Sequence, residues 1–182
     1  MATLPLAEPV APLLSVEEYL RTVYEPECEY IDGVLEERNV GEYEHSRMQM
    51  LIGFLLMQHE KEWGIHLLSE MRTRVSATRY RVPDITVLRA DAPRERITTH
   101  PPLIAIEILS PEDRMSRMQT RIDDFLAMGV ENIWIIDPGQ RTAWTADASG
   151  LHVPENQVLS VAGTPIRLSL SELLREFRKN EC

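Results

Sequence analysis

The hydrophobic pattern of the chain switches between a helical period and the short apolar runs typical of strands. Four runs predict buried strands, at about 65–75, 80–88, 103–109 and 133–137. Between the last two, apolar residues recur at helical spacing from Met115 to Leu126, and Ser110 and Pro111 are suited to open this helix. A strand, a helix and a second apolar strand of this length favour a βαβ unit with parallel strands.

A second helix is predicted over about 42–63, ahead of the first strand. Met48, Leu51 and Leu55 lie at three-to-four spacing, and Gly64 is a suitable end. Three further apolar residues widen this face, so we expect the helix to be largely buried. They are Met50, Phe54 and Met57.

The flanking segments carry local signals for turns and helix starts. Residues 1–14 hold three prolines and show no period, which predicts a loose arm. Asp32-Gly33 predicts a two-residue hairpin joining 28–31 to 34–37. Two capping-box patterns, at 15–18 and 169–172, predict short helices, and an outer hairpin is expected to turn at 148–150.

Length and composition indicate a single α/β domain over 1–182, with 43% hydrophobic and 26% charged residues. No apolar run approaches the roughly 18 residues that span a membrane, so no membrane partner is expected. The first 14 residues lack the basic start and long apolar stretch of a secretory signal, which predicts a cytoplasmic protein. Cys28 and Cys182 form neither a disulfide framework nor a metal-binding spacing.

Charge limits the chemistry further. The net charge of −10, from 19 basic and 29 acidic residues, argues against broad, non-specific binding of phosphates, although a local basic groove is compatible with it. Only Lys61 and Lys179 are lysines, so a mechanism that needs a catalytic lysine has almost no candidate.

Two predicted strands each carry one carboxylate among apolar residues, Asp84 and Glu107. A buried carboxylate without a partner costs several kcal/mol, so a cation is expected beside each. If the strands are neighbours, the two groups can converge on a hard cation such as Mg²⁺. The alternative is that each pairs with an arginine and serves only the structure.

Longer segments show a resemblance. Pro83-Asp84, followed about twenty residues later by Glu107-Ile108-Leu109, resembles the signature of the PD-(D/E)xK nuclease superfamily. The segments EYIDG, EHS, YRVPDITVL, IEILSPEDR and GVENIWIIDP resemble the Uma-type restriction endonuclease family over most of 28–138. The resemblance implies a restriction-endonuclease-like core over 42–138, in the order helix, three strands, helix, strand, with an N-terminal hairpin and C-terminal additions.

The resemblance also implies an activity, the metal-dependent hydrolysis of DNA phosphodiesters, and a homodimer. Carried over by position, Asp84 and Glu107 would bind Mg²⁺ or Mn²⁺, and the backbone carbonyl of Ile108 would complete the metal shell. The superfamily's lysine would fall at Leu109, which cannot polarise water. In the family this lysine is moved into the following helix, where Arg121 stands here.

Arg121 holds a phosphate well but stays protonated, so it could stabilise charge and could not act as a base. Together with Arg114 and Arg117 it forms one stripe on its helix. The alternative interpretation is a solvated arginine face that pairs with Asp113 and Asp124.

Three other residues are candidates for the site. His45, in the EHS segment, is a proton shuttle, a phosphate contact or simply a packing residue. Glu70, on the strand before the PD pair, is expected to lie beside Asp84 and assist it. Glu29, in the EYIDG hairpin, either closes the site or orients the hairpin.

The sequence thus favours a metal-dependent DNA endonuclease. One alternative is a catalytically weak or inactive module of the same fold that binds DNA or a protein partner, favoured by Leu109 and the acidic charge. Another is a metal-dependent phosphodiesterase that acts on RNA or small nucleotides.

Overall fold

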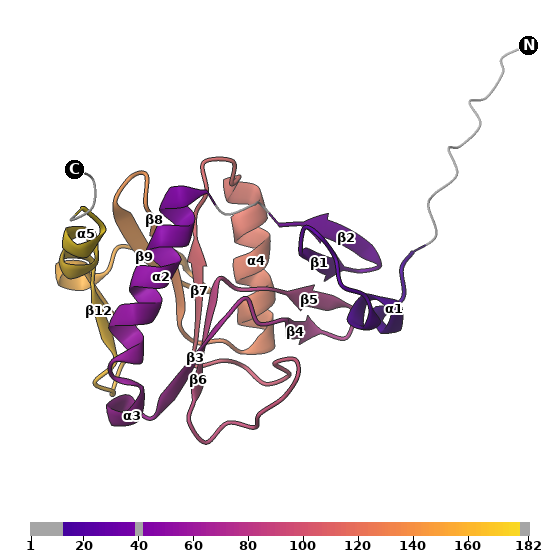
Figure 1. The fold of residues 1–182 in the computed structure, drawn as a ribbon, viewed down its shortest axis with the longest axis horizontal. Helices are drawn as coiled ribbons and strands as arrows, with labels where there is room; N and C mark the ends of the chain where they lie inside the picture. Colours follow the sequence, from indigo (N-terminus) through magenta and orange to yellow (C-terminus); the bar gives the residue numbers. More distant parts are fainter. Residues whose placement is uncertain (1–12, 39–41, 179–182) are drawn as a thin grey trace, which may run out of the picture.

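The computed structural model describes residues 13–38 and 42–178. Most of the predicted arm at 1–14 and Cys182 therefore lie outside the described residues. The chain forms a central sheet with helices on both faces, beside a smaller sheet that carries the N-terminal hairpin (Figure 1).

The central sheet has six strands in the order β10-β9-β8-β7-β6-β3. Its parallel pair, β7 and β8, is joined by α4, which confirms the predicted βαβ unit, and the other neighbours are antiparallel. The bounds are β3 (Ile65–Ser69), β6 (Ile85–Arg89), β7 (Ile104–Ile108), α4 (Met115–Met128), β8 (Ile133–Asp137), β9 (Thr142–Asp147) and β10 (Gly150–His152).

Each face of this sheet carries its own apolar core. On one face lie α2 (Tyr43–Met57) and α5 (Leu170–Arg178), with the two-stranded sheet of β11 (Val158–Ser160) and β12 (Arg167–Ser169) (Figure 1). On the other face α4 covers Ala105 and Ile133. Since side chains alternate along β7, Ile106 and Ile108 point toward α2, whereas Glu107 points toward α4.

The smaller sheet has the order β2-β1-β5-β4. Its hairpin turns at Asp32 and Gly33, whose φ angles of 51° and 94° fit the predicted two-residue turn. Three tyrosines, Tyr19, Tyr30 and Tyr80, pack together beneath it. The bounds are α1 (Val16–Arg21), β1 (Cys28–Ile31), β2 (Val34–Glu37), β4 (Thr73–Ser76) and β5 (Arg79–Arg81).

Two strand predictions were wrong in the same way. The runs at 65–75 and 80–88 each divide between the two sheets, as β3 with β4 and β5 with β6. The breaks fall at Glu70, with a φ of 51°, and at Pro83-Asp84, where proline has no amide to give to a ladder. Asp84 therefore lies in the crossing between the sheets and not in the middle of a strand.

The helix predictions also need correction at their boundaries. The helix predicted over 42–63 ends at Met57 and is followed by the short α3 (Glu60–Trp63), with Gly64 as its left-handed C-cap. The helix predicted from Ser110 begins at Met115, because Asp113 bonds back to the Ser110 amide (Oδ2 to N, 2.7 Å) and closes a separate turn.

The burial predicted for the first of these helices was wrong on one side. Met48 and Leu51 are buried against the sheet, but Met50, Phe54 and Met57 are exposed. The apolar residues of α2 therefore cover two opposite faces, and among the described residues only one of these faces is packed.

The C-terminal predictions are confirmed. The outer hairpin turns between β9 and β10, and α5 begins after Ser169, whose hydroxyl accepts from the Glu172 amide at 3.3 Å. A 3₁₀ turn at η1 (Glu155–Gln157) connects β10 to β11.

Candidate active site

The register of β6 and β7 brings the two predicted carboxylates together. Ile85 pairs with Ile106, so the register places Asp84, one residue before β6 begins, opposite Glu107 of β7. The Ile108 amide donates to Asp84 Oδ2 at 2.7 Å and so fixes the carboxylate at the end of the ladder. Both side chains are buried, with 3% and 2% of their surface exposed.

Cationic groups surround the Asp84 carboxylate. Arg38 Nη2 lies 2.6 Å from Oδ1, and His45 Nε2 lies 3.2 Å from Oδ2. Burial by itself would raise the pKa of Asp84, but the hydrogen bond and charge of His45 and the charge of Arg38 hold that pKa below its ordinary value. Asp84 is therefore an anion at neutral pH.

Glu107 differs from Asp84 although it lies opposite. Burial is the main reason that its pKa is raised to about 7, and the negative charges of Asp84 and Glu29 add to the effect. Arg121 opposes this shift, since its Nη2 lies 2.8 Å from both carboxylate oxygens. A proton on Glu107 is thus held only weakly near neutral pH.

Arg121 reaches the site from α4 and is buried. Besides Glu107 it contacts Glu29 Oε1 through Nη1 at 3.0 Å and the Val82 carbonyl through Nη2 at 3.2 Å. Its Nε has no hydrogen-bond partner among the described residues. Although burial opposes it, the charges of Glu107 and Glu29 raise the pKa of Arg121, so this side chain stays a cation.

The alternative interpretation of the arginine stripe was wrong for Arg121. Its side chain is only 15% exposed, whereas that of Arg117 is 51% exposed. Asp124, one of the partners expected on a solvated face, instead binds Arg79 and Arg81. The helix therefore presents one arginine to the interior and another to solvent.

His45 contacts Asp84 inside the site, whereas Glu70 lies at the surface beside it. His45, in the first turn of α2, contacts Asp84 directly, and its buried Nδ1 has no partner in the described part of the chain. Burial lowers the pKa of His45, but the Asp84 carboxylate outweighs it, so the pKa is raised. The Glu70 side chain is 56% exposed and reaches Arg38 Nη1 at 3.2 Å rather than the Asp84 carboxylate.

Sequence reasoning missed two neighbours of Asp84. Arg38 follows the hairpin, 46 residues before Asp84, and no local pattern singles it out. Gln49 donates to the Asp84 carbonyl at 2.8 Å. Its position four residues after His45, on the same face of α2, is a signal that could have indicated it.

Glu29 anchors the hairpin to the site. It is buried, and it accepts from the Val82 amide at 2.8 Å and from Arg81 Nη1 at 2.7 Å. Its other contact, to Arg121, joins the smaller sheet to α4. Glu29 therefore does both things that the sequence left open, because it orients β1 and borders the site.

Asp84 and Glu107 line a cavity of about 50 Å³, enough for a small ion with one or two waters. Within 13–38 and 42–178 no three His, Cys, Asp or Glu side chains form a metal cluster. The oxygen donors nevertheless suit a hard cation, since two carboxylates face each other here. The Ile108 carbonyl is a third donor, because it points to the same side of β7 as the Ile108 amide, which donates to Asp84. In this structure the guanidinium group of Arg38 pairs with Asp84, and that of Arg121 pairs with Glu107.

Among solved structures, a putative nuclease resembles this chain along nearly its whole length. It is a protein from Anabaena variabilis described as "a putative nuclease belonging to DUF820", with a TM-score of 0.78 and 24% identity, covering 90% of this chain and 99% of that one. At that identity the likeness shows the fold, and it confirms the restriction-endonuclease-like core of α2, β3, β6, β7, α4 and β8.

The other comparisons add less. A DrdV–DNA complex matches with a TM-score of 0.39 and 16% identity over 76% of this chain and 13% of that one, too slight a likeness for an argument. No curated protein matches significantly. Among the described helices, none combines the length and the apolar character needed to cross a membrane.

The family is shown by the sequence. The model of the Uma2 family, described as "Putative restriction endonuclease", matches residues 16–177. This span contains the hairpin, both sheets, and Asp84 and Glu107 with their cationic partners. The chain therefore belongs to the Uma2 family of restriction-endonuclease-like proteins.

Proposed function

We propose that this chain is a metal-dependent endonuclease that hydrolyses DNA phosphodiester bonds above Asp84 and Glu107. The observation that carries the proposal is that these two buried carboxylates face each other at the end of the β6–β7 ladder. The charge of Asp84 raises the pKa of Glu107, so the two carboxylates resist joint ionisation without a cation, and buried groups of this kind are concentrated at functional sites. Membership of a nuclease family supports the same chemistry.

Asp84, Glu107 and the Ile108 carbonyl would hold Mg²⁺ or Mn²⁺. Such an ion, when bound, lowers the pKa of water and stabilises the charge that develops on a phosphate. Asp84 offers a permanent negative charge, whereas Glu107 releases a proton near neutral pH. The two carboxylates are thus prepared for a divalent cation in different ways.

The chain's own cations would act on the phosphate. Arg121 carries a fixed positive charge beside the two carboxylates, so it can stabilise the charge that develops on a phosphate, where Leu109 cannot. His45, with an unpaired Nδ1 and a raised pKa, can hold or pass a proton beside Asp84. Glu70 would assist only indirectly, since it pairs with Arg38 at the rim of the site. In a homodimer, each of the two sites would cut one strand of a DNA duplex.

A second candidate is a module that binds DNA or a protein without cleaving. The observation that favours it is that the oxygens of both carboxylates already accept hydrogen bonds from Arg38, His45 and Arg121. A divalent cation would have to displace part of this network, and buried ion pairs are costly to break.

Cleavage of supercoiled plasmid, single-stranded DNA and RNA, each with Mg²⁺ or Mn²⁺, tests the proposal. We expect wild type to cut DNA and Glu107→Gln to lose the activity, because the amide keeps the shape and removes the charge. Glu131→Gln, at an exposed position away from the site, serves as the matched control.

The other outcomes separate the candidates. If wild type cuts nothing but binds DNA, the second candidate replaces the first. If wild type cut RNA in preference to DNA, the substrate would be RNA and the proposal of a DNA endonuclease would be replaced. Equal cleavage by wild type and Glu107→Gln would place the activity elsewhere and overturn the proposed site.

A further inference from the structure

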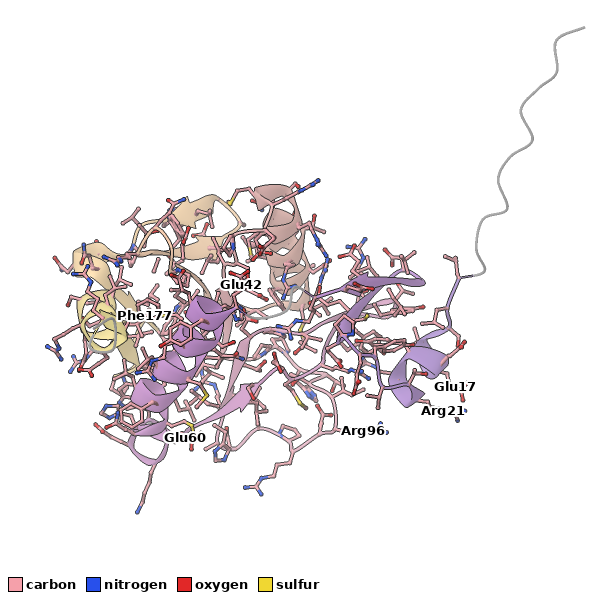
Figure 2. All side chains as sticks on the ribbon, turned by 45° about the horizontal axis from the view of Figure 1, so that its top comes forward. Glu17, Arg21, Glu42, Glu60, Arg96 and Phe177 are labelled. Carbon is pink, nitrogen blue, oxygen red and sulfur yellow. The ribbon has the colours of Figure 1, made fainter. Side chains whose placement is uncertain are left out.

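The outward face of α2 is apolar and uncovered. Tyr43, Met50, Phe54 and Met57 expose 74%, 70%, 61% and 57% of their surface, and with Arg47 they form what we call the outer α2 stripe. In Figure 2 the helix runs between the labelled Glu42 and Glu60, and no ribbon segment passes in front of it. Packing against the described residues, 13–38 and 42–178, does not explain why these positions are apolar.

The spacing of the stripe is that of a helix-packing seam. From Tyr43 to Met57 its five members follow each other at steps of four, three, four and three residues, the alternation that keeps a seam facing a partner helix. Met50, Gly53, Phe54 and Met57 lie at the four positions that border one hole, into which a partner's side chain can insert. A Cβ at Gly53 would meet nothing within 4 Å, so the hole is open.

The exposed area suits an interface. With about 200 Å² for a large side chain, the four apolar residues offer roughly 500 Å² per copy, at the upper end of what a typical monomer exposes as one patch. A stable interface buries about 800 Å² on each partner. Gln58 and Lys61 are polar and exposed beside the stripe. If they are also covered, the buried area per copy comes closer to about 800 Å².

Charge indicates which partner fits and in which direction. Arg47 makes no ion pair with any described residue, and a parallel second copy would place it against its own equivalent. An antiparallel copy would place it near α3, where the two acids Glu60 and Glu62 outnumber the single cation, Lys61. The same arrangement sets Phe54 over Gly53 and Met50 beside Met57. With one arginine and an acidic neighbour, Glu44, the stripe is not suited to a nucleic acid.

We propose that two copies of this chain pair through their outer α2 stripes, antiparallel, about a twofold axis that passes between Gly53 and Phe54. Phe54 of each copy fills the hole at Gly53 of the other, and Arg47 of each copy faces the α3 acids of the other. The pairing uses none of the groups that line the Asp84 cavity, so it stands or fails independently of the nuclease activity.

The mass in solution tests the pairing. We expect sedimentation at micromolar concentration to show a dimer for wild type, and monomers for Phe54→Glu and for Phe54→Lys alone. Mixing these two variants should restore a dimer, because opposite charges then meet near the axis. Val153→Glu, at another exposed apolar position, is the matched control and should stay dimeric. Circular dichroism checks that each variant is folded.

A cysteine experiment tests the direction of the helices. In a Cys182→Ser background, Phe54→Cys should form a disulfide-linked dimer on mild oxidation, whereas Tyr43→Cys should not, since its two copies lie at opposite ends. Linkage through position 43 would show parallel pairing and overturn the arrangement. A monomeric wild type at 100 μM, or a dimer that survives Phe54→Glu, would overturn the interface itself.

Discussion

Two buried ionic clusters lie side by side in this molecule, and they differ in how completely their polar atoms are satisfied. In the cluster of Arg81, Glu29 and Asp124, the three guanidinium nitrogens of Arg81 all meet a carboxylate at 2.7 Å. In the cluster of Asp84, Glu107 and Arg121, one arginine nitrogen has no partner among the described residues.

The difference separates a structural role from a functional one. A complete network holds the smaller sheet against α4 and leaves no group free to meet a ligand. An incomplete network keeps unused hydrogen-bonding capacity, which is costly in a folded protein unless something binds there. Changes in the first cluster should therefore reduce stability, and changes in the second should mainly reduce activity.

The largest effect is expected for Arg81→Met. It leaves Glu29 and Asp124 without their shared cation in the interior, which should lower the free energy of unfolding by about 3–5 kcal/mol. Urea unfolding followed by circular dichroism measures the change. Arg175→Met, on the surface of α5, should alter stability by less than about 0.5 kcal/mol. If both variants lowered the free energy of unfolding equally, the cluster around Arg81 would have no special structural role.

Arg121→Gln should chiefly affect catalysis. If Arg121 stabilises the phosphate, kcat/KM for DNA cleavage should fall about 10²- to 10³-fold, as when one charge-stabilising donor is lost. Steady-state cleavage measures it, with Arg175→Gln as the control. A loss of stability without a change in the activity of the folded fraction would assign Arg121 to structure alone.

Glu107 should make stability depend on pH. Its pKa is raised to about 7 in the folded protein, so between about 4.5 and 7 the folded state holds a proton that the unfolded state has lost. Stability of the metal-free protein should therefore fall as the pH rises through this window, by about 1–3 kcal/mol. Urea unfolding at pH 5 and pH 8 measures the fall.

The slope should be smaller in Glu107→Gln, which cannot titrate at that position. His45, with its raised pKa, loses stabilisation in the same direction as the pH rises, so some slope should remain in the variant. Identical slopes in the two proteins would mean that Glu107 is not the group responsible.

The smallest effect is expected for Glu70→Gln. Glu70 touches Arg38 at the rim and is more than half exposed, so kcat/KM should fall less than about tenfold. Cleavage assays at two salt concentrations measure it, since a contact at the rim should weaken further as ionic strength rises. A loss as large as that of Glu107→Gln would mean that Glu70 acts at the metal.

The sequence predicted what local chemistry decides. The turn at Asp32-Gly33, the C-cap at Gly64 and the helix cap at Ser169 depend on neighbours in the chain, and all three are present. The opposition of Asp84 and Glu107 followed from strand adjacency, which the apolar runs made a reasonable expectation.

Contacts between distant segments were beyond prediction. Arg38, which directly follows β2, meets Asp84, and neither residue has a neighbour in the sequence that signals the other. The apolar runs that contain Glu70 and Asp84 do not reveal that each crosses from one sheet to another. Apolar periodicity in α2 indicated burial but could not distinguish a face covered by this chain from one left outside.

The site lies at the first turn of α2, and this position sets a length scale. In an antiparallel pair centred between Gly53 and Phe54, each His45 lies about 13 Å along the axis from the centre, so the two are separated by about 25 Å at 1.5 Å per residue. A straight duplex parallel to the helices rises about 3.4 Å per base pair. It would meet the two sites about seven base-pair steps apart.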